Sequence, residues 1–360
     1  MAASFGEKLL GEVIEARLDE ILHDLRNICP DETSSRLGVR ALDNLLEVFM
    51  PVPAPQQHPD ENSNLQPEDR AHHGVRARPD PVVEISSTSS AAGKSQLLYH
   101  LTAIAVLPAM IDNIQIGGRN AAVVFIDTDG RFDADRLLAV ARGIIQQRLK
   151  QQMVEQLDIE TTLLTSLQHI HVFRPTSSAS LLATIHSLES YLFDISRHIS
   201  TKRSLHAILI DSATSFFWQD KLRDQIARIE EIGRPHAEIE HDRRLKQSFY
   251  IADMYAELVR ALKKVQSVFG CAVVYTTTVW VGRAASVSGE ELVAFRCSLP
   301  PPWGLFPTLR IVVRANGQGS FLGCVNGLGR EEWPRRVVEG LEGRSRGTFV
   351  FGVDRDGVYV

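Results

Sequence analysis

The sequence predicts an α/β fold built on a mostly parallel β-sheet with helices on both faces. Two observations support this fold class. The runs 121–126 (AAVVFI) and 205–210 (LHAILI) are apolar almost throughout, which is typical of strands buried on both faces. Such runs alternate along the chain with segments of helical periodicity, as expected for repeated β-α-β units.

Composition narrows the class of protein. A chain of 360 residues can hold one large α/β domain with attachments. Its net charge of -5 argues against a protein that coats nucleic acid by bulk positive charge, so any contact with DNA must be local. The four cysteines form no C-x-x-C pair, which predicts neither a zinc site nor a disulfide framework. The longest apolar stretch, 103–111, is interrupted by Pro108 and too short to span a bilayer, so we expect a soluble, intracellular protein without a membrane partner.

The chain is predicted to have three parts. Residues 1–50 form an amino-terminal helical segment, in which apolar residues of 5–25 recur at helical spacing. This helix either packs on its own domain or docks on a partner. Residues 51–81 are rich in Pro, Asn, Gln, Asp and His and predict a disordered linker, while residues 82–360 form the α/β core.

The sequence of the first half of the core predicts two strands and two helices. Val82–Ile85 is predicted to be a strand, and Ser95–Leu107 a helix that Pro108 stops. A buried strand follows at Ala121–Ile126. Phe132–Arg148 is predicted to be a helix, with Asp133 or Asp135 near its start, where an acid suits the helix dipole.

The second half continues the alternation. Segments with apolar residues at helical spacing lie between further predicted strands. The turn that starts at Asp354 predicts a hairpin in which the last residues fold back on the preceding strand. The highly charged segment 220–247 has the mixed signs of a solvated helix or loop. The predicted strands are His169–Phe173, Leu205–Ile210, Cys271–Thr276, Leu309–Arg314 and Thr348–Val353, and the stripes are Leu181, Ile185, Leu188, Leu192 and Ile251, Tyr255, Leu258, Leu262, Val265.

The run Ala92-Gly93-Lys94-Ser95 lies between a predicted strand and a predicted helix. A P-loop wraps backbone N–H groups around phosphates, places its lysine on the β and γ phosphates and binds magnesium through its Ser or Thr hydroxyl. The full motif G-x-x-x-x-G-K-[ST] is not met, because Thr88 stands at the first glycine position. The short run by itself is therefore a weak signal.

A second signal comes from the apolar strand that closes on Asp211. In P-loop proteins an aspartate in this place lies beside the magnesium that the P-loop hydroxyl holds. An aspartate after a strand also caps helices, and this alternative stays open for Asp211 alone. With Lys94 upstream and strands of suitable spacing, the nucleotide site is the better interpretation.

Several longer runs resemble the RecA-like recombinase paralogue family, which acts in homologous-recombination DNA repair. The resemblance covers about residues 82–280, with a weaker match near the carboxyl end. Its fold is a RecA-like P-loop NTPase core. The runs that carry it are Glu84-Ile85, Gly93–Ser95, Leu98–Ala103 (LYHLTA), Leu107-Pro108, Phe125–Asp129 and Asp211–Trp218 (DSATSFFW).

The resemblance implies roles for individual residues and two ligands, ATP and Mg²⁺. Ala92, Gly93 and Lys94 then bind the phosphates, and Ser95 and Asp211 the metal. Asp129 stands where active recombinases hold the catalytic glutamate that orients water, and Arg136 where an arginine stacks on adenine. Thr278 occupies the place of a glutamine that senses the γ phosphate, and the segments after Trp218 and Trp280 look like the two DNA-contacting loops.

Departures from the family pattern indicate slow turnover. Thr88 and Ala91 replace glycines, Asp129 is one methylene shorter than glutamate, and Thr278 is too short to span what a glutamine spans. We therefore expect ATP binding rather than fast hydrolysis, in a nuclear subunit that binds other recombinase paralogue subunits and reaches single-stranded or branched DNA through the complex. The alternatives are an autonomous DNA-stimulated ATPase and an unrelated P-loop enzyme such as a small-molecule kinase.

Overall fold

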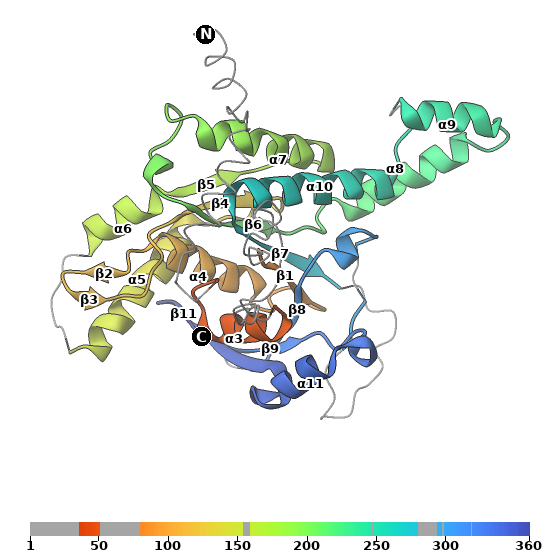
Figure 1. The fold of residues 1–360 in the computed structure, drawn as a ribbon. Coiled ribbons are helices and arrows are strands. Elements are labelled where there is room, and N and C mark those ends of the chain that lie inside the picture. Colours follow the sequence, from red (N-terminus) through yellow and green to blue (C-terminus); the bar gives the residue numbers. More distant parts are fainter. Residues whose placement is uncertain are drawn as a thin grey trace, which may run out of the picture. The chain divides into compact units, whose positions relative to one another are not determined.

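A computed structural model describes residues 36–50, 80–153, 159–245, 248–279, 294–296, 299–317 and 319–360 (Figure 1). The helix predicted in 5–25 and most of the predicted linker, up to residue 79, lie outside the described residues. None of the described helices combines the length and apolar character needed to cross a membrane.

The centre of the fold is one β-sheet, which has nine strands within the described residues. Its order is β11-β10-β9-β8-β1-β7-β6-β4-β5. The strands from β8 to β5 run parallel, and β9, β10 and β11 extend one side of the sheet antiparallel. The bounds are β1 (Val82–Ser87), β4 (Ala122–Asp127), β5 (Ile170–Phe173), β6 (Leu205–Asp211), β7 (Ala272–Thr278), β8 (Leu309–Ala315), β9 (Ser320–Val325), β10 (Thr348–Val353) and β11 (Val358–Tyr359), with a separate hairpin of β2 (Met110–Ile111) and β3 (Ile114–Gln115).

Helices cover both faces of this sheet, which confirms the predicted fold class (Figure 1). Alternate residues of the central strands β4, β6 and β7 enter two different cores: Val123 and Phe125 of β4 face one, and Val124 and Ile126 face the other. This division explains why the strand sequences show no polar alternation. The first core contains residues of α3 (Arg40–Phe49), α4 (Lys94–Val106), α5 (Ala134–Gln151), α6 (Glu160–Leu167) and α11 (Arg335–Glu342), and the second those of α7 (Ser178–Phe193), α10 (Ile251–Phe269) and the 3-10 turn η3 (Trp303–Leu305).

The remaining helices are α8 (Phe217–Glu230) and α9 (His236–Arg244), which follow β6. They lie beside and beyond α10, away from the sheet (Figure 1). Short 3-10 turns complete the fold at η2 (Ser200–Lys202), η4 (Arg330–Glu332) and η5 (Ser345–Gly347).

Most predicted elements are confirmed within one to three residues. The predicted acid at the start of α5 is Asp133, whose carboxylate accepts from the backbone N–H of Arg136 at 3.0 Å. The predicted carboxyl-terminal hairpin is β10–β11, which pairs Gly352 with Tyr359. Strand β9 and helix α11 were not predicted, because the glycine-rich sequence around β9 and the charged helix α11 lack a long apolar pattern.

Helix α3 lies in the same compact unit as residues from Asp80 onward. Its Asp43 carboxylate accepts from the backbone N–H groups of Arg36, Leu37 and Gly38 at 3.1, 2.7 and 3.1 Å. Its other end contacts α11 and β8, where the ring of Phe49 meets that of Trp333 edge to face. The end of the predicted segment 1–50 therefore packs with the predicted core, and the boundary of the linker stays a prediction.

Candidate functional site

Polar side chains gather where four neighbouring parallel strands end. Strands β1, β7, β6 and β4 are adjacent in the sheet. Their last residues pair in register, Ser87 with Thr278 and Asp127 with Asp211. Ligands of open α/β sheets bind at this carboxyl edge, so the predicted site residues converge where chemistry is expected.

The loop between β1 and α4 has the backbone of a phosphate-binding turn. Ala91 and Gly93 adopt left-handed φ angles of 58° and 86°, and α4 begins directly after Gly93 at Lys94. A Cβ on Gly93 would lie 3.0 Å from the rings of Phe321 and Phe351, so this glycine is required by its φ angle and by packing. Thr88 lies outside the left-handed region, so its side chain causes no backbone strain there.

The ammonium group of Lys94 lies at the end of β1, at the first turn of α4. Its Nζ donates to Ser87 Oγ, and Ser87 Oγ donates to the carbonyl of Ser89 at 2.7 Å. Burial lowers the pKa of Lys94, while the nearby carboxylates of Asp211 and Asp129 raise it. Lys94 and the N–H groups that begin α4 give this end of the loop the positive charge that a bound anion would need.

Asp211 and Ser95 meet at the end of β6. The Asp211 carboxylate accepts hydrogen bonds from the Ser95 hydroxyl and from Thr276 Oγ1, the latter at 2.5 Å. Burial raises the pKa of Asp211, and these two hydrogen bonds oppose that shift. A hydroxyl and a carboxylate side by side are the oxygen donors that Mg²⁺ takes when phosphate oxygens and water complete its shell.

Asp129 lies on the exposed side of this pair. Its backbone N–H donates to the Asp211 carbonyl at 3.3 Å, and its carboxylate accepts from Ser215 Oγ. Ser215 Oγ also lies 2.9 Å from the Ser212 carbonyl oxygen and 2.8 Å from Thr128 Oγ1. The structure thus places Asp129 in the site but engages its carboxylate with a neighbouring hydroxyl.

Asp127, two residues earlier at the end of β4, has a structural role. Its two carboxylate oxygens accept from the backbone N–H groups of Arg131 and Phe132, each at 3.0 Å, and from Arg174 Nε at 3.1 Å. These bonds fix the loop that leads to α5. The tyrosine of the LYHLTA run supports the same loop, because Tyr99 OH accepts from the Asp133 N–H at 2.9 Å.

Arg136 lies at the start of α5, beside the first turn of α4. Its guanidinium donates to Gln96 Oε1 at 2.8 Å and to the carbonyls of Arg355 and Gly357 at 2.8 and 3.2 Å. These bonds hold the turn between β10 and β11 against the site. The predicted contact of Arg136 with adenine stays a prediction.

One sequence interpretation differs from what is seen, and a second stays untested. The segment after Trp218 is the helix α8 rather than a loop, and the segment after Trp280 lies outside the described residues. Thr278 lies beside Thr214, whose Oγ1 accepts from the Thr278 N–H at 3.2 Å. Sequence reasoning missed Thr276, the partner of Asp211, because nothing in a run of three threonines distinguishes the one that faces β6.

The donor set fits a magnesium nucleotide. Lys94 and the loop supply positive charge for phosphates, and Ser95 with Asp211 supplies two hard oxygen donors. Within the described ranges no group of three or more His, Cys, Asp or Glu forms a metal site by itself. A metal here would therefore depend on phosphate oxygens for part of its coordination, as in other P-loop sites.

No protein-family model matches the chain. The chain is 35% identical over 130 residues to the mouse DNA repair protein XRCC2, covering 36% of this chain and 39% of that protein. It is 24% identical to the Arabidopsis thaliana DNA repair protein XRCC2 homolog, over 67% of this chain and 71% of that protein. It is 26% identical to the mouse DNA repair protein RAD51 homolog 2, over 54% of this chain and 47% of that protein.

These similarities confirm the resemblance to the recombinase paralogues and the RecA-like type of the core. The runs at 98–103 and 211–218 had favoured XRCC2 among them. The similar segment spans about two fifths of the mouse XRCC2 protein. A RecA-like core implies a nucleotide-binding fold.

Proposed function

We propose that this chain is a recombinase paralogue subunit that supports homologous-recombination repair of DNA double-strand breaks and cross-links in the nucleus. It works inside an assembly with other paralogue subunits and helps to load or stabilise a recombinase on single-stranded or branched DNA. The observation that carries this proposal is the cluster of Lys94, Ser95 and Asp211 at the carboxyl edge of the sheet, in a chain similar to DNA repair proteins.

ATP with Mg²⁺ is the proposed ligand of this cluster. Lys94 meets the β and γ phosphates, and the loop through Ala92 and Gly93 presents its N–H groups to them. Ser95 and Asp211 hold the metal, which neutralises phosphate charge when bound. The N–H groups along the edge of the Arg136 guanidinium donate to backbone carbonyls. An adenine would therefore contact the flat face of the guanidinium.

Slow turnover is the second part of the proposal. Asp129 is the proposed catalytic carboxylate, but a short side chain that already accepts from Ser215 is poorly placed to orient water. Thr278 ends β7 with a side chain too short for a γ-phosphate sensor that must span the site. The nucleotide then serves to stabilise a conformation of the subunit, and its binding free energy is added to the stability of the bound state.

The edge of the sheet at β5 supports assembly with a partner subunit. β5 ends the sheet order, so along its outer side it pairs with no strand of the described residues. Exposed apolar side chains lie near this edge: Val172 on β5, and Ile195 and Ile199 in the segment that follows α7. A strand edge with exposed apolar residues is a ready site for an added strand of another protein.

ATP turnover by the purified chain, with and without single-stranded DNA, tests the proposal. We expect nucleotide binding that Lys94→Ala weakens, and little hydrolysis in either condition. Hydrolysis at the rate of an active recombinase, stimulated by DNA and lost in Asp129→Ala, would instead favour the autonomous ATPase. Failure to bind nucleotide, together with failure to co-purify with any recombinase paralogue, would refute both.

A further inference from the structure

Helix α8 turns two carboxylates toward the protein. Its buried residues are Asp220, Asp224 and Ala227, which recur at helical spacing on one side. Most helices on the surface of a domain turn an apolar stripe inward and charged residues outward. In α8 the inward positions include two carboxylates.

Hydrogen bonds from α7 and α10 hold these two carboxylates. Asp220 accepts from Ser178 Oγ at the start of α7 and from Tyr255 OH at 3.3 Å. Asp224 accepts from the backbone N–H of Ile251 at 3.1 Å, where α10 begins. Together with the buried Ala227 and with Phe217, which packs against the second core, these bonds fix the position of α8.

The outward face of α8 carries an apolar stripe. Trp218, Leu222, Ile226 and Ile229 are 54%, 58%, 46% and 66% exposed. Their spacing of four, four and three residues places them on one side of the helix, over a length of about 16 Å. Three turns of apolar surface on one helix match the face that a second amphipathic helix presents when it packs lengthwise.

Positive charge borders this stripe. Lys221 lies 5.1 Å from the centre of the Trp218 ring, and the exposed Arg223 lies 4.5 Å from the centre of the Phe249 ring, while Arg228 is paired with the buried Asp224 at 2.8 Å. Glu230 is the acidic residue on the exposed part of α8, since both aspartates are buried. Like charges would oppose the same surface of a second copy, whereas carboxylates beside a partner's apolar stripe would complement it.

The chemistry of the stripe favours a protein over a nucleic acid. Sites for single-stranded nucleic acid combine cations with aromatic rings on which bases stack. Three of the four stripe residues, Leu222, Ile226 and Ile229, are aliphatic and offer no stacking surface. We propose that the outward face of α8 is a docking surface for an amphipathic helix of a partner protein, whose apolar stripe is bordered by Asp or Glu.

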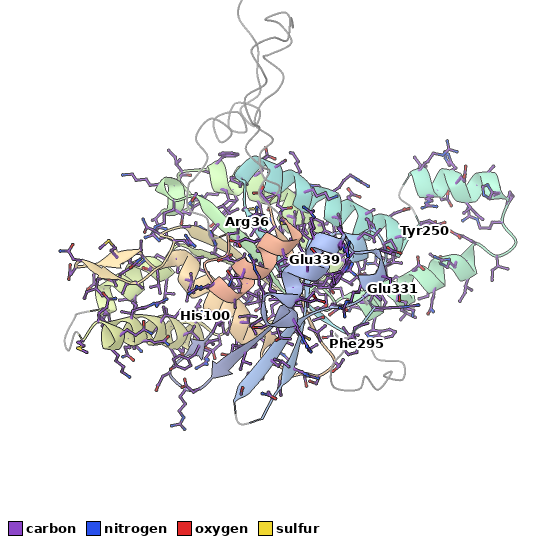
Figure 2. All side chains as sticks on the ribbon, turned by 60° about the horizontal axis from the view of Figure 1, so that its bottom comes forward. Arg36, His100, Tyr250, Phe295, Glu331 and Glu339 are labelled. Atoms are coloured by element: carbon purple, nitrogen blue, oxygen red, sulfur yellow. The ribbon has the colours of Figure 1, made fainter. Side chains whose placement is uncertain are left out.

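This surface is separate from the edge of the sheet at β5, and the positions to be changed, Leu222 and Ile226, are not among the residues of the nucleotide site. It belongs to the hairpin of α8 and α9, whose base is held by the hydrogen bond from Tyr250 to Glu231 (Tyr250 is labelled in Figure 2). A failure of the docking surface would therefore leave the proposed function untouched.

Fluorescence anisotropy with labelled peptides on the full chain tests the proposal. One peptide has about three heptads with Leu at a and d and Glu at e and g, and the other has Lys in place of Glu. We expect the Glu peptide to bind at least about tenfold more tightly than the Lys peptide. Leu222→Ser with Ile226→Ser should weaken the Glu peptide at least about tenfold, and Lys221→Glu with Arg223→Glu should reverse the preference.

Met110→Ser is the matched control, because Met110 is as exposed as the stripe residues but lies on the β2–β3 hairpin. It should leave peptide binding unchanged, and all variants should keep the melting temperature of the native chain. Equal binding of both peptides, or none, would overturn the proposal. Three other results would also overturn it. An oligonucleotide that competes with the peptide would indicate a nucleic-acid site, and concentration-dependent self-association that the Leu222 and Ile226 variant loses would indicate a second copy. Peptide binding that appears only after removal of residues 1–30 would indicate that this segment occupies the surface.

Discussion

Ile210→Asp is expected to unfold the core, whereas Lys94→Ala is expected to leave it intact. Ile210 lies one residue before Asp211 on β6, with its side chain fully buried in the core that α7 and α10 cover. In register it lies between Ile126 of β4 and Tyr275 of β7. No water reaches this position, so a carboxyl group there has neither solvent nor a partner.

The expected loss follows from two contributions. Removing the buried isoleucine side chain costs about 1.5–3 kcal/mol. A buried aspartate must also be protonated at pH 7, about three units above its usual pKa, which adds about 4 kcal/mol. The sum of about 6 kcal/mol is a large part of the 5–15 kcal/mol that stabilises a typical domain.

Urea unfolding of the purified variants and survival of cells after cross-linking damage measure this difference. Ile210→Asp should abolish both folding and survival, and Ile210→Val should cost about 0.5–1.5 kcal/mol and preserve survival. Lys94→Ala should change the free energy of unfolding by less than about 1 kcal/mol and keep most survival, because turnover is not the proposed function. Survival with Lys94→Ala as low as after gene deletion, at normal protein level, would refute this reasoning and favour the ATPase.

Three further outcomes are expected. Gly93→Ala should weaken binding of a fluorescent nucleotide at least about tenfold, whereas the control Gly130→Ala should not. Both substitutions place an alanine at a positive φ, which costs about 1–2 kcal/mol, but only at Gly93 would the new Cβ also lie 3.0 Å from aromatic rings. Burial lowers the pKa of His100 (Figure 2) from 6.5 to about 4, so its neutral form contributes stability that is present above pH 6.5 and lost as pH falls through 4. Urea unfolding should show a loss of about 3 kcal/mol over that range from this histidine, and His100→Leu should remove that part of the slope. Limited proteolysis should cut first within the predicted linker, residues 51–81, and the fragment with α3 should co-elute with the core; earliest cuts inside the core would contradict the linker boundary.

The alternation of apolar runs and helical stripes was enough to predict the sheet and most of its helices. A strand buried on both faces is apolar at most of its positions, and that local pattern is visible in β4 and β6. The convergence of Lys94, Ser95 and Asp211 was also predictable, because the carboxyl ends of parallel strands share one edge. Strand β9 and helix α11 were not predicted, because neither segment has a long apolar pattern of its own.

The sequence by itself determined the fold class and the residue types of the nucleotide site. Only the tertiary structure decided how those residues are used: Asp127 holds a loop, Asp129 accepts from Ser215, and Thr276 bonds Asp211. It also decided that α8 turns its carboxylates inward and its apolar stripe outward. The physical reason is that periodicity reports which residues share a face of an element, while the partner of that face comes from segments distant in the chain.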